Sequence, residues 1–244
     1  MVTQLLFGEI FYIEDKQQEW FKIHSHFDDY SGWVNIKQVL VISQDLFDVL
    51  VSTQTSQTYV NQPVAFAQSA DAQIPLVFGS TLPLFKQGTF TIADTTYRYE
   101  GDEAYQCTGQ TPERLAFFAI KYINAPYLWG GRSPFGIDCS GFTQNVFKFC
   151  GYTLLRDASQ QAQQGTTINF VSEVQVGDLL FFSNFKPDAN EQDDRITHVG
   201  MALGNEQVIH ASGMVRIDTI DHLGIFNHEQ GVYTHCLRLI KRII

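Results

Sequence analysis

The stretch G-I-D-C-S-G-F at residues 136–142 decides how the second half of the sequence folds. Small and polar residues precede a run of apolar residues at helical spacing, so we predict a helix that begins here and ends before Gly151. Cys139 then lies in the first turn of that helix. Peptide N–H groups and the helix dipole stabilise an anion at this end, so we expect a lowered pKa for the Cys139 thiol and a nucleophilic thiolate.

Two histidines further along the chain supply a base and a partner that orients it. His198 lies in T-H-V-G-M and His210 in V-I-H-A-S, within two strand-like segments. With the hairpin turn centred on Gly204, each histidine is six residues from the centre, so we predict that the two lie directly opposite each other. His210 is then expected to bind one ring nitrogen of His198 and to leave the other for Cys139.

Tyr127 lies twelve residues before Cys139, in Y-L-W-G-G. Its hydroxyl and the backbone N–H of Cys139 are candidates for an oxyanion hole. A simple packed aromatic is the alternative. The glycines that follow Tyr127 predict a tight loop that lets the backbone approach the site.

The segments on either side of this region predict an α+β chain. A helix is expected over residues 111–123, with Thr111 as its N-cap and Pro112 at its first position. Strands are expected at V-G-D-L-L-F-F, T-H-V-G-M-A-L and Q-V-I-H-A-S, with a charged surface loop between the first two. Short strand-like runs fill residues 1–43, such as L-L-F-G-E-I-F-Y-I-E, and residues 44–108, such as V-L-V-S-T. They favour two small β-barrels, so the predicted domains are 1–43, 44–109 and 110–244.

Composition narrows the classes of function. The 244 residues are 44% hydrophobic and 17% charged, with a net charge of −10. This composition excludes a disordered chain, and no run of about 18 apolar residues could span a membrane. The acidic balance argues against nucleic acid or a membrane as the partner. The N-terminus lacks the features of a secretory signal, so we expect a cytoplasmic protein, or a periplasmic one if a leader has been removed.

Four motifs in order, Y-L-W-G-G, D-C-S-G-F, H-V-G-M and I-H-A-S, resemble those of the NlpC-type papain-like cysteine peptidases of bacterial cell-wall metabolism. The resemblance covers about residues 110–244. It implies a papain-like domain with helices packed on an antiparallel sheet, and a catalytic triad of Cys139, His198 and His210 assisted by Tyr127. We expect no cofactor and no metal.

The N-terminal half resembles the tandem bacterial SH3-like barrels that accompany one branch of this family. The first barrel matches through Y-S-G-W-V, whereas the second is divergent and no ligand residue is assigned to it. That branch cleaves the bond from γ-D-glutamate to the diamino acid in small wall peptides. A monomer that hydrolyses soluble murein tripeptides or tetrapeptides, as in peptidoglycan recycling, is therefore expected, with the diamino acid left open between meso-diaminopimelate and lysine.

The same branch holds the free amino group of L-Ala, and this resemblance implies five substrate-binding residues: Glu9, Tyr30, Asp138, Ser140 and Ser159. The alternatives are a solvated strand residue for Glu9, a turn aromatic for Tyr30, a helix N-cap for Asp138 and a small first-turn residue for Ser140. An acid beside a thiolate opposes thiolate formation. Asp138 therefore makes better sense beside a cation, such as a substrate ammonium.

Other polar residues are expected to be structural. Arg156 and Gln160 support the fold, His24 and His26 lack a third metal ligand, and no role is assigned to His222, His228 or His235. Cys107, Cys150 and Cys236 are expected in the core, and Asp193 and Asp194 in a solvated loop.

Three other functions stay open: a non-catalytic protein that binds wall peptides, a hydrolase of polymeric peptidoglycan, and amide or acyl transfer on lipids.

Overall fold

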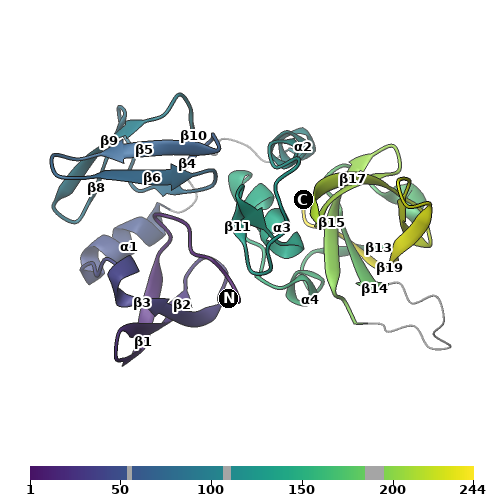
Figure 1. Ribbon diagram of the computed structural model, residues 1–244, viewed down its shortest axis with the longest axis horizontal. Helices are drawn as coiled ribbons and strands as arrows, with labels where there is room; N and C mark the ends of the chain where they lie inside the picture. The colour runs from purple at the N-terminus through teal and green to yellow at the C-terminus, as the bar shows by residue number, and fades with distance from the viewer. Residues whose placement is uncertain (54–56, 107–110, 185–194) are drawn as a thin grey trace. The chain divides into compact units, whose positions relative to one another are not determined.

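The computed structural model describes residues 1–53, 57–106, 111–184 and 195–244 (Figure 1). The chain forms two compact units, Met1–Gly109 and Gln110–Ile244. The further division of the first unit at residue 43 stays a prediction. Within the described ranges, none of the helices has both the length and the apolar character needed to cross a membrane.

The described residues of the first unit form three small antiparallel sheets, one α-helix and one short 3-10 helix. The sheets have the strand orders β1-β2-β3, β10-β4-β7 and β6-β5-β9-β8. Their elements are β1 (Phe11–Gln17), β2 (Trp20–Ser25), β3 (Ser31–Asn35), η1 (Ile36–Gln38), α1 (Gln44–Ser52), β4 (Thr58–Val60), β5 (Val64–Gln68), β6 (Gln73–Val77), β7 (Thr81–Leu82), β8 (Thr89–Ile92), β9 (Thr95–Glu100) and β10 (Ala104–Gln106).

Two strand predictions in this unit are wrong. The V-L-V-S-T run belongs to α1, because Ser43 caps the helix and accepts the N–H of Leu46 at 3.3 Å, while Phe47 and Leu50 bury one helical face. The first run becomes a strand only at Phe11, because Gly8 turns the chain with a φ of +80°. A Cβ at Gly8 would lie 2.2 Å from the carbonyl oxygen of Thr81, so glycine is required there.

The second unit packs helices against a large antiparallel sheet. Its elements are α2 (Pro112–Ile120), β11 (Arg132–Ser133), β12 (Gly136–Ile137), α3 (Cys139–Phe149), α4 (Ala158–Gln161), β13 (Thr166–Ile168), η3 (Val171–Glu173), β14 (Leu179–Asn184), β15 (His198–Gly204), β16 (Gln207–Ser212), β17 (Met214–Ile220), β18 (Gly224–Asn227) and β19 (Val232–Arg242). The predicted helices and the three predicted strands of this half are confirmed.

The large sheet closes on itself. Its strand order is β13-β19-β14-β15-β16-β17-β18, and β18 also pairs with β19. Figure 1 shows the green and yellow strands curling round in this way. Apolar side chains fill the interior: Leu180, Phe182, Ala202, Val208, Ile220, Ile225 and Ile240. This closed sheet is a stiff support for polar side chains on its strands.

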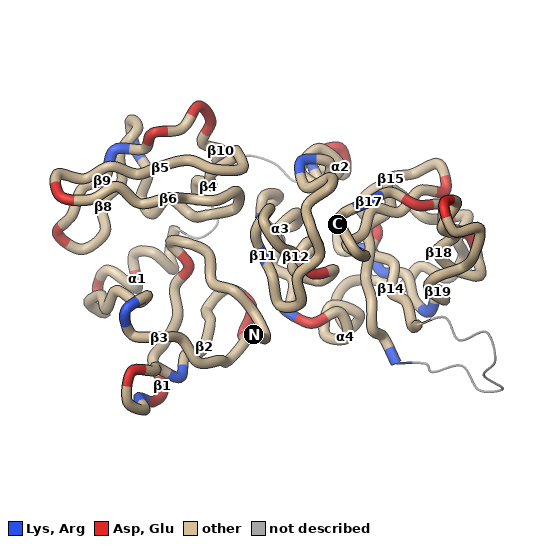
Figure 2. Tube along the Cα trace, in the orientation of Figure 1, with Lys and Arg blue, Asp and Glu red and all other residues tan. Residues whose placement is uncertain are grey.

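Helix α3 is the buried centre of the unit. All eleven of its residues are buried, and it lies against β15 and β16. Lys148 is its one charged residue, and Figure 2 accordingly shows α3 almost without charge. Helix α2 packs on it through stacked rings of Phe118 and Phe149, whose centroids are 4.4 Å apart.

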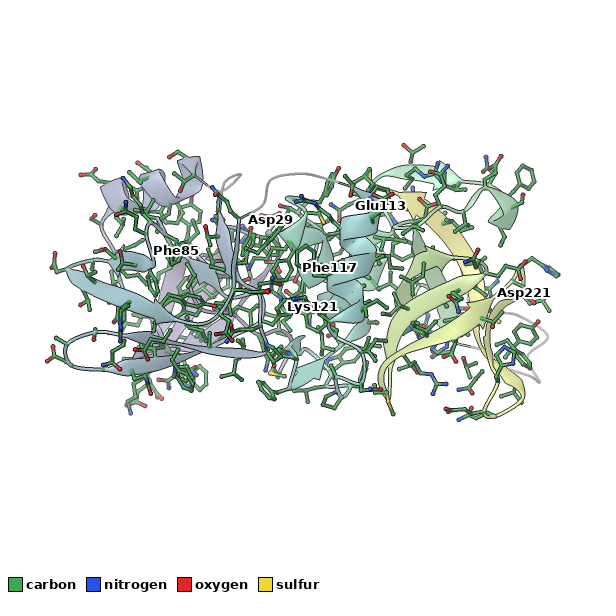
Figure 3. All side chains as sticks on the ribbon, turned by 90° about the horizontal axis from the view of Figure 1, so that it is seen from above. Asp29, Phe85, Glu113, Phe117, Lys121 and Asp221 are labelled. Carbon is green, nitrogen blue, oxygen red and sulfur yellow. The ribbon has the colours of Figure 1, made fainter. Side chains whose placement is uncertain are left out.

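The outer side of α2 is amphipathic. Glu113, Phe117 and Lys121 follow one another along this helix in Figure 3. Phe117 is 56% exposed, and the Nζ of Lys121 lies 5.0 Å from the centre of its ring. The lysine therefore shields an exposed aromatic face by a cation–π contact.

Candidate active site

Cys139 is the first residue of α3, as predicted, and Asp138 is its N-cap. The carboxylate Oδ1 of Asp138 accepts the N–H of Gly141 at 2.7 Å. A Cβ at Gly141 would lie 2.5 Å from the carbonyl oxygen of Gly131, so the fourth letter of D-C-S-G must be glycine. These contacts fix the first turn of the helix, and with it the Cys139 backbone N–H.

The environment of the Cys139 thiol differs from the one expected. Burial raises the pKa of Cys139 to about 11, and the neighbouring charge of Asp138 adds to the rise. Backbone hydrogen bonds from Val199 and Ser140, and the charge of Arg156, act in the opposite direction without outweighing burial. The expected lowering at the helix N-terminus is therefore wrong, because the thiol is only 7% exposed.

Tyr127 lies close enough to Cys139 for the two groups to interact electrostatically. It bridges to Ile137 in parallel register, two residues before Cys139, and its own N–H donates to the carbonyl of Gly213 at 2.9 Å. Burial, together with the charges of Cys139 and Asp138, raises the pKa of Tyr127 to about 12. Its hydroxyl therefore keeps its proton at neutral pH and is able to donate a hydrogen bond.

The two histidines meet through their rings. The Nε2 of His198 lies 2.8 Å from the Nδ1 of His210, as predicted, and the side chains are 6% and 1% exposed. Val199, the residue after His198, makes one of the backbone hydrogen bonds to the Cys139 sulfur. His198 is thus adjacent in sequence to a residue that contacts the thiol, and its Nδ1 is the ring nitrogen that does not face His210.

The predicted register of this hairpin is wrong by two residues. His210 lies opposite Gly200, so His198 is its diagonal neighbour on the same face. The turn residues are Asn205 and Glu206, with φ of +50° and +58°, the two-residue geometry of a primed hairpin turn, and the register shifts between Ala202 and Gly204. Two rings reach each other across this diagonal where short side chains would not.

Gly200 makes room for the pair. A Cβ there would lie 2.6 Å from Cγ2 of Val208 and 3.0 Å from the Cβ of His210. We expect Gly200→Ala to displace His210 and to lower kcat/KM of the activity proposed below by about 10-fold to 100-fold. Overpacking should also reduce the free energy of unfolding by about 1–3 kcal/mol. Kinetics and thermal unfolding of the variant test both effects, and wild-type kinetics would contradict this explanation of the glycine.

Three residues missed by the sequence analysis complete the histidine site. Asp218 Oδ2 lies 3.0 Å from Nε2 of His210, and Arg216 pairs with both oxygens of Asp218. His235 stacks on His198, with centroids 4.3 Å apart and planes 25° apart. The sequence M-V-R-I-D-T-I at residues 214–220 could have indicated Arg216 and Asp218. Its polar residues alternate with apolar ones, which predicts a strand with both side chains on one face directly after the His210 strand.

The histidines are neutral at neutral pH. Burial, followed by the charges of His210 and His235, holds the pKa of His198 well below its usual range. Burial likewise lowers the pKa of His210 against the opposing effect of Asp218, and it lowers the pKa of His235 to about 4. The resting protein therefore holds a neutral Cys139 thiol and neutral imidazoles, and no preformed ion pair is expected.

This state makes a prediction about alkylation. Without substrate, the rate at which iodoacetamide modifies Cys139 should rise continuously from about pH 6 to about pH 10, because the thiolate forms only at the raised pKa. The rate is measured by mass spectrometry of the peptide that contains Cys139. A plateau already reached near neutral pH would show that the thiolate–imidazolium pair exists in the free protein.

Asp138 has a cation as its neighbour, and that cation is Arg156. Both side chains are buried, and the guanidinium donates to the two carboxylate oxygens at 3.1 and 2.7 Å. Arg156 also donates to Oγ of Ser140 at 2.9 Å, and the N–H of Gly130 donates to Asp138 at 2.8 Å. The N-cap role of Asp138 is confirmed, and Arg156 is brought into the site. The role of Asp138 and Ser140 in binding a substrate stays a prediction.

The remaining predicted substrate residues belong to α4 and to the first unit. Ser159 is exposed on α4. In the first unit, Glu9 is half-buried before β1, where its Oε2 accepts the N–H of Leu6 at 3.0 Å. Tyr30 is half-buried before β3, and its carbonyl accepts the N–H of Ser25 at 2.8 Å. Their binding roles stay predictions.

Several residues expected to be structural make local contacts or are buried. Cys150 and Cys236 are buried, which confirms the expectation, whereas Cys107, Asp193 and Asp194 lie outside the described residues. His24 pairs with Asp29 and Ser31, His26 contacts the rings of Tyr12 and Phe47, and His228 contacts Thr219. Among the residues that the structure describes, no three His, Cys, Asp or Glu side chains gather as a metal site.

Comparison with known proteins adds to this geometry. The NlpC/P60 family matches residues 124–233, and the bacterial dipeptidyl-peptidase Sh3 domain matches residues 1–39. The chain is 31% identical over 224 residues to a γ-D-glutamyl-L-lysine dipeptidyl-peptidase of Bacillus subtilis, covering 86% of this chain and 71% of the relative. It is 28% identical over 233 residues to the protein of that name from Bacillus cereus, covering 86% of this chain and 66% of the relative.

A solved structure shares the fold. The crystal structure of an NlpC/P60 family protein from Bacillus cereus matches with a TM-score of 0.79 and 24% identity, over 99% of this chain and 81% of the other. The predicted α+β fold, with a papain-like domain after SH3-like strands, is thereby confirmed. These matches agree with the Asp-capped cysteine and the paired histidines of the site. The chain belongs to the NlpC/P60 family.

Proposed function

We propose that this protein is a cysteine peptidase that hydrolyses the bond from γ-D-glutamate to the L-diamino acid in murein peptides with a free N-terminal L-Ala. The observation that carries the proposal is the hydrogen bond of 2.8 Å between His198 and His210, on strands that pack against the helix headed by Cys139. The names of the two Bacillus relatives support the choice of bond. The chain spans 66% and 71% of their lengths.

The proposed first step is attack of the Cys139 sulfur on the γ-carbonyl carbon. Because the resting thiol is neutral, its proton passes to Nδ1 of His198 as the S–C bond forms. The carbonyl oxygen becomes an oxyanion, and the Cys139 N–H and the Tyr127 hydroxyl donate to it. Tyr127 keeps its proton at neutral pH because burial raises its pKa to about 12.

The proposed later steps release the two products. His198 gives its proton to the amine of the diamino acid as the C–N bond breaks, which leaves a thioester on Cys139. Water, deprotonated by His198, then attacks the thioester, and the C–S bond breaks to regenerate the thiol. The products are L-Ala-γ-D-Glu and a peptide or amino acid that begins with the diamino acid.

We further propose that Glu9, Tyr30, Asp138, Ser140 and Ser159 bind the substrate and that the peptides are soluble recycling intermediates. Asp138 and Ser140 belong to the buried cluster with Arg156, whose guanidinium balances the charge of Asp138. Loss of Asp138 therefore combines loss of the α3 cap with any loss of binding. Glu9 and Ser159 allow cleaner substitutions, because neither is in that cluster.

The test incubates the full chain separately with L-Ala-γ-D-Glu-L-Lys, with its meso-diaminopimelate counterpart and with purified intact cell walls. The proposal predicts new amino groups from at least one tripeptide and no soluble fragments from intact walls. Binding of a tripeptide without hydrolysis would identify a wall-peptide binding protein. Release of fragments from intact walls would identify a hydrolase of the polymer. Either result would overturn the proposed function.

A further inference from the structure

We propose that Asp218 is a positioning residue that sets the proton positions on both active-site histidines, and that Arg216 holds it in place. The effect of Asp218 on catalysis rests on the proposed function. The positions of the protons themselves do not, because they follow from contacts within the free protein.

The polar side chains form a row across three neighbouring strands. His198 lies on β15, His210 on β16, and Arg216 and Asp218 on β17. Arg216 is directly opposite His210 in the register, and Asp218 is its diagonal neighbour. The row is linked at 2.8 Å between the two histidines and at 3.0 Å between His210 and Asp218. Asp218 is 7% exposed, so water does not compete freely for these contacts.

Asp218 is an ionised acceptor. Nε of Arg216 donates to Oδ2 of Asp218 at 2.7 Å, and Nη2 of the same guanidinium donates to Oδ1 at 2.9 Å. Burial opposes ionisation, but the hydrogen bonds from His210 and Arg216 outweigh it and lower the pKa of Asp218 to about 2. A carboxylate accepts only. The proton between His210 and Asp218 therefore belongs to Nε2 of His210.

The proton position on His210 determines that on His198. A neutral imidazole with its proton on Nε2 presents a lone pair at Nδ1. The Nδ1 of His210 faces Nε2 of His198, so His198 must donate there and carry its proton on Nε2. Its Nδ1 then has the lone pair that a base needs. Asp218 contacts His210 and not His198 in this row of hydrogen bonds. It nevertheless selects the tautomer of His198 that can act as a base.

Arg216 opposes the protonation of His210 that Asp218 alone would favour. A carboxylate alone favours the charged form of His210, whereas the charge of Arg216 disfavours it. Arg216 is itself held by Glu229, whose Oε2 accepts a hydrogen bond from Nη1 of Arg216 at 3.2 Å. The guanidinium therefore both orients Asp218 and balances its charge.

The test begins with the unmodified protein. Nitrogen-15 NMR of the histidine rings near neutral pH reports which ring nitrogen carries the proton, with His210 signals assigned by their loss in His210→Gln. The inference predicts a proton on Nε2 in both His198 and His210. A proton on Nδ1 of His210 would overturn it, whether or not the protein cleaves murein peptides.

The second arm replaces the carboxylate. In Asp218→Asn the amide can donate to Nε2 of His210, which moves the ring proton to Nδ1 and reverses the hydrogen bond to His198. We expect a changed tautomer signal and a kcat lowered by about 10-fold to 100-fold at nearly unchanged KM. Asp178→Asn is the matched control, because Asp178 is 2% exposed and accepts from Arg242 at 2.8 and 2.7 Å without contacting a histidine.

The two variants separate positioning from general stabilisation. The control should unfold more easily than the wild type yet keep its histidine signals and a kcat within about twofold. Equal tautomer signals and equal kcat in Asp218→Asn and Asp178→Asn would overturn the inference. A wild type that hydrolyses no murein peptide would refute the proposed function, while the ring signals would still decide the inference.

Discussion

Replacing Cys139 by alanine is expected to lower kcat for the murein tripeptide by at least about 10⁴-fold while leaving its binding nearly unchanged. The sulfur is the atom proposed to form the thioester, and no other described side chain at the head of α3 is a nucleophile of comparable strength. Calorimetric titration of the variant with tripeptide measures the binding, and release of amino groups measures turnover.

Cys150→Ala supplies the control for this experiment. Cys150 is the C-cap of the same helix and is fully buried, so its loss affects stability without touching the site. Near wild-type turnover in Cys150→Ala beside inactive Cys139→Ala is the predicted pattern. Turnover that survives in Cys139→Ala would require a different nucleophile and would remove the basis of the mechanism.

Acetylating the N-terminal L-Ala of the tripeptide is expected to lower kcat/KM by about 10³-fold to 10⁴-fold. A free ammonium can form charge-assisted hydrogen bonds with a carboxylate, each worth about 1.5–3 kcal/mol. The acetylated amine has lost its charge and leaves its acidic partner unsatisfied. The measurement compares kcat/KM of the full chain for the two forms.

Glu9→Gln tests which carboxylate is responsible. The selectivity for the free amine should shrink in this variant, because the amide keeps the shape of the side chain without its charge. Glu14→Gln, in the same unit and paired with Lys22 at 2.9 Å, is the control and should keep the full selectivity. Equal kcat/KM for the free and acetylated peptides in the wild type would refute the requirement for a free amine.

The site was most predictable where local chemistry determines the structure. The N-cap preference of Asp138 and the turn demanded by Gly151 place Cys139 at a helix start, and both follow from neighbouring letters alone. The alternation around His198 and His210 likewise predicts two strands with the histidines on one face. These local rules do not depend on the rest of the fold.

Features that depend on the closed sheet were not predictable in the same way. The position of His235 beside His198 requires β19 to pair with β14, a contact between strands far apart in the sequence. The raised pKa of Cys139 depends on burial, which the helix-terminus argument ignores. The register error arose from the turn, because two positive φ angles at Asn205 and Glu206 move the hairpin centre away from Gly204.

The measurement that tests the central claim most directly is mass spectrometry of the products formed from L-Ala-γ-D-Glu-L-Lys and its meso-diaminopimelate counterpart by the wild-type chain. The mechanism through Cys139 and His198 predicts the masses of L-Ala-γ-D-Glu and the free diamino acid from at least one of the two, and neither product in Cys139→Ala. Intact tripeptides, or release of L-Ala in place of the dipeptide, in the presence of folded protein would contradict the account.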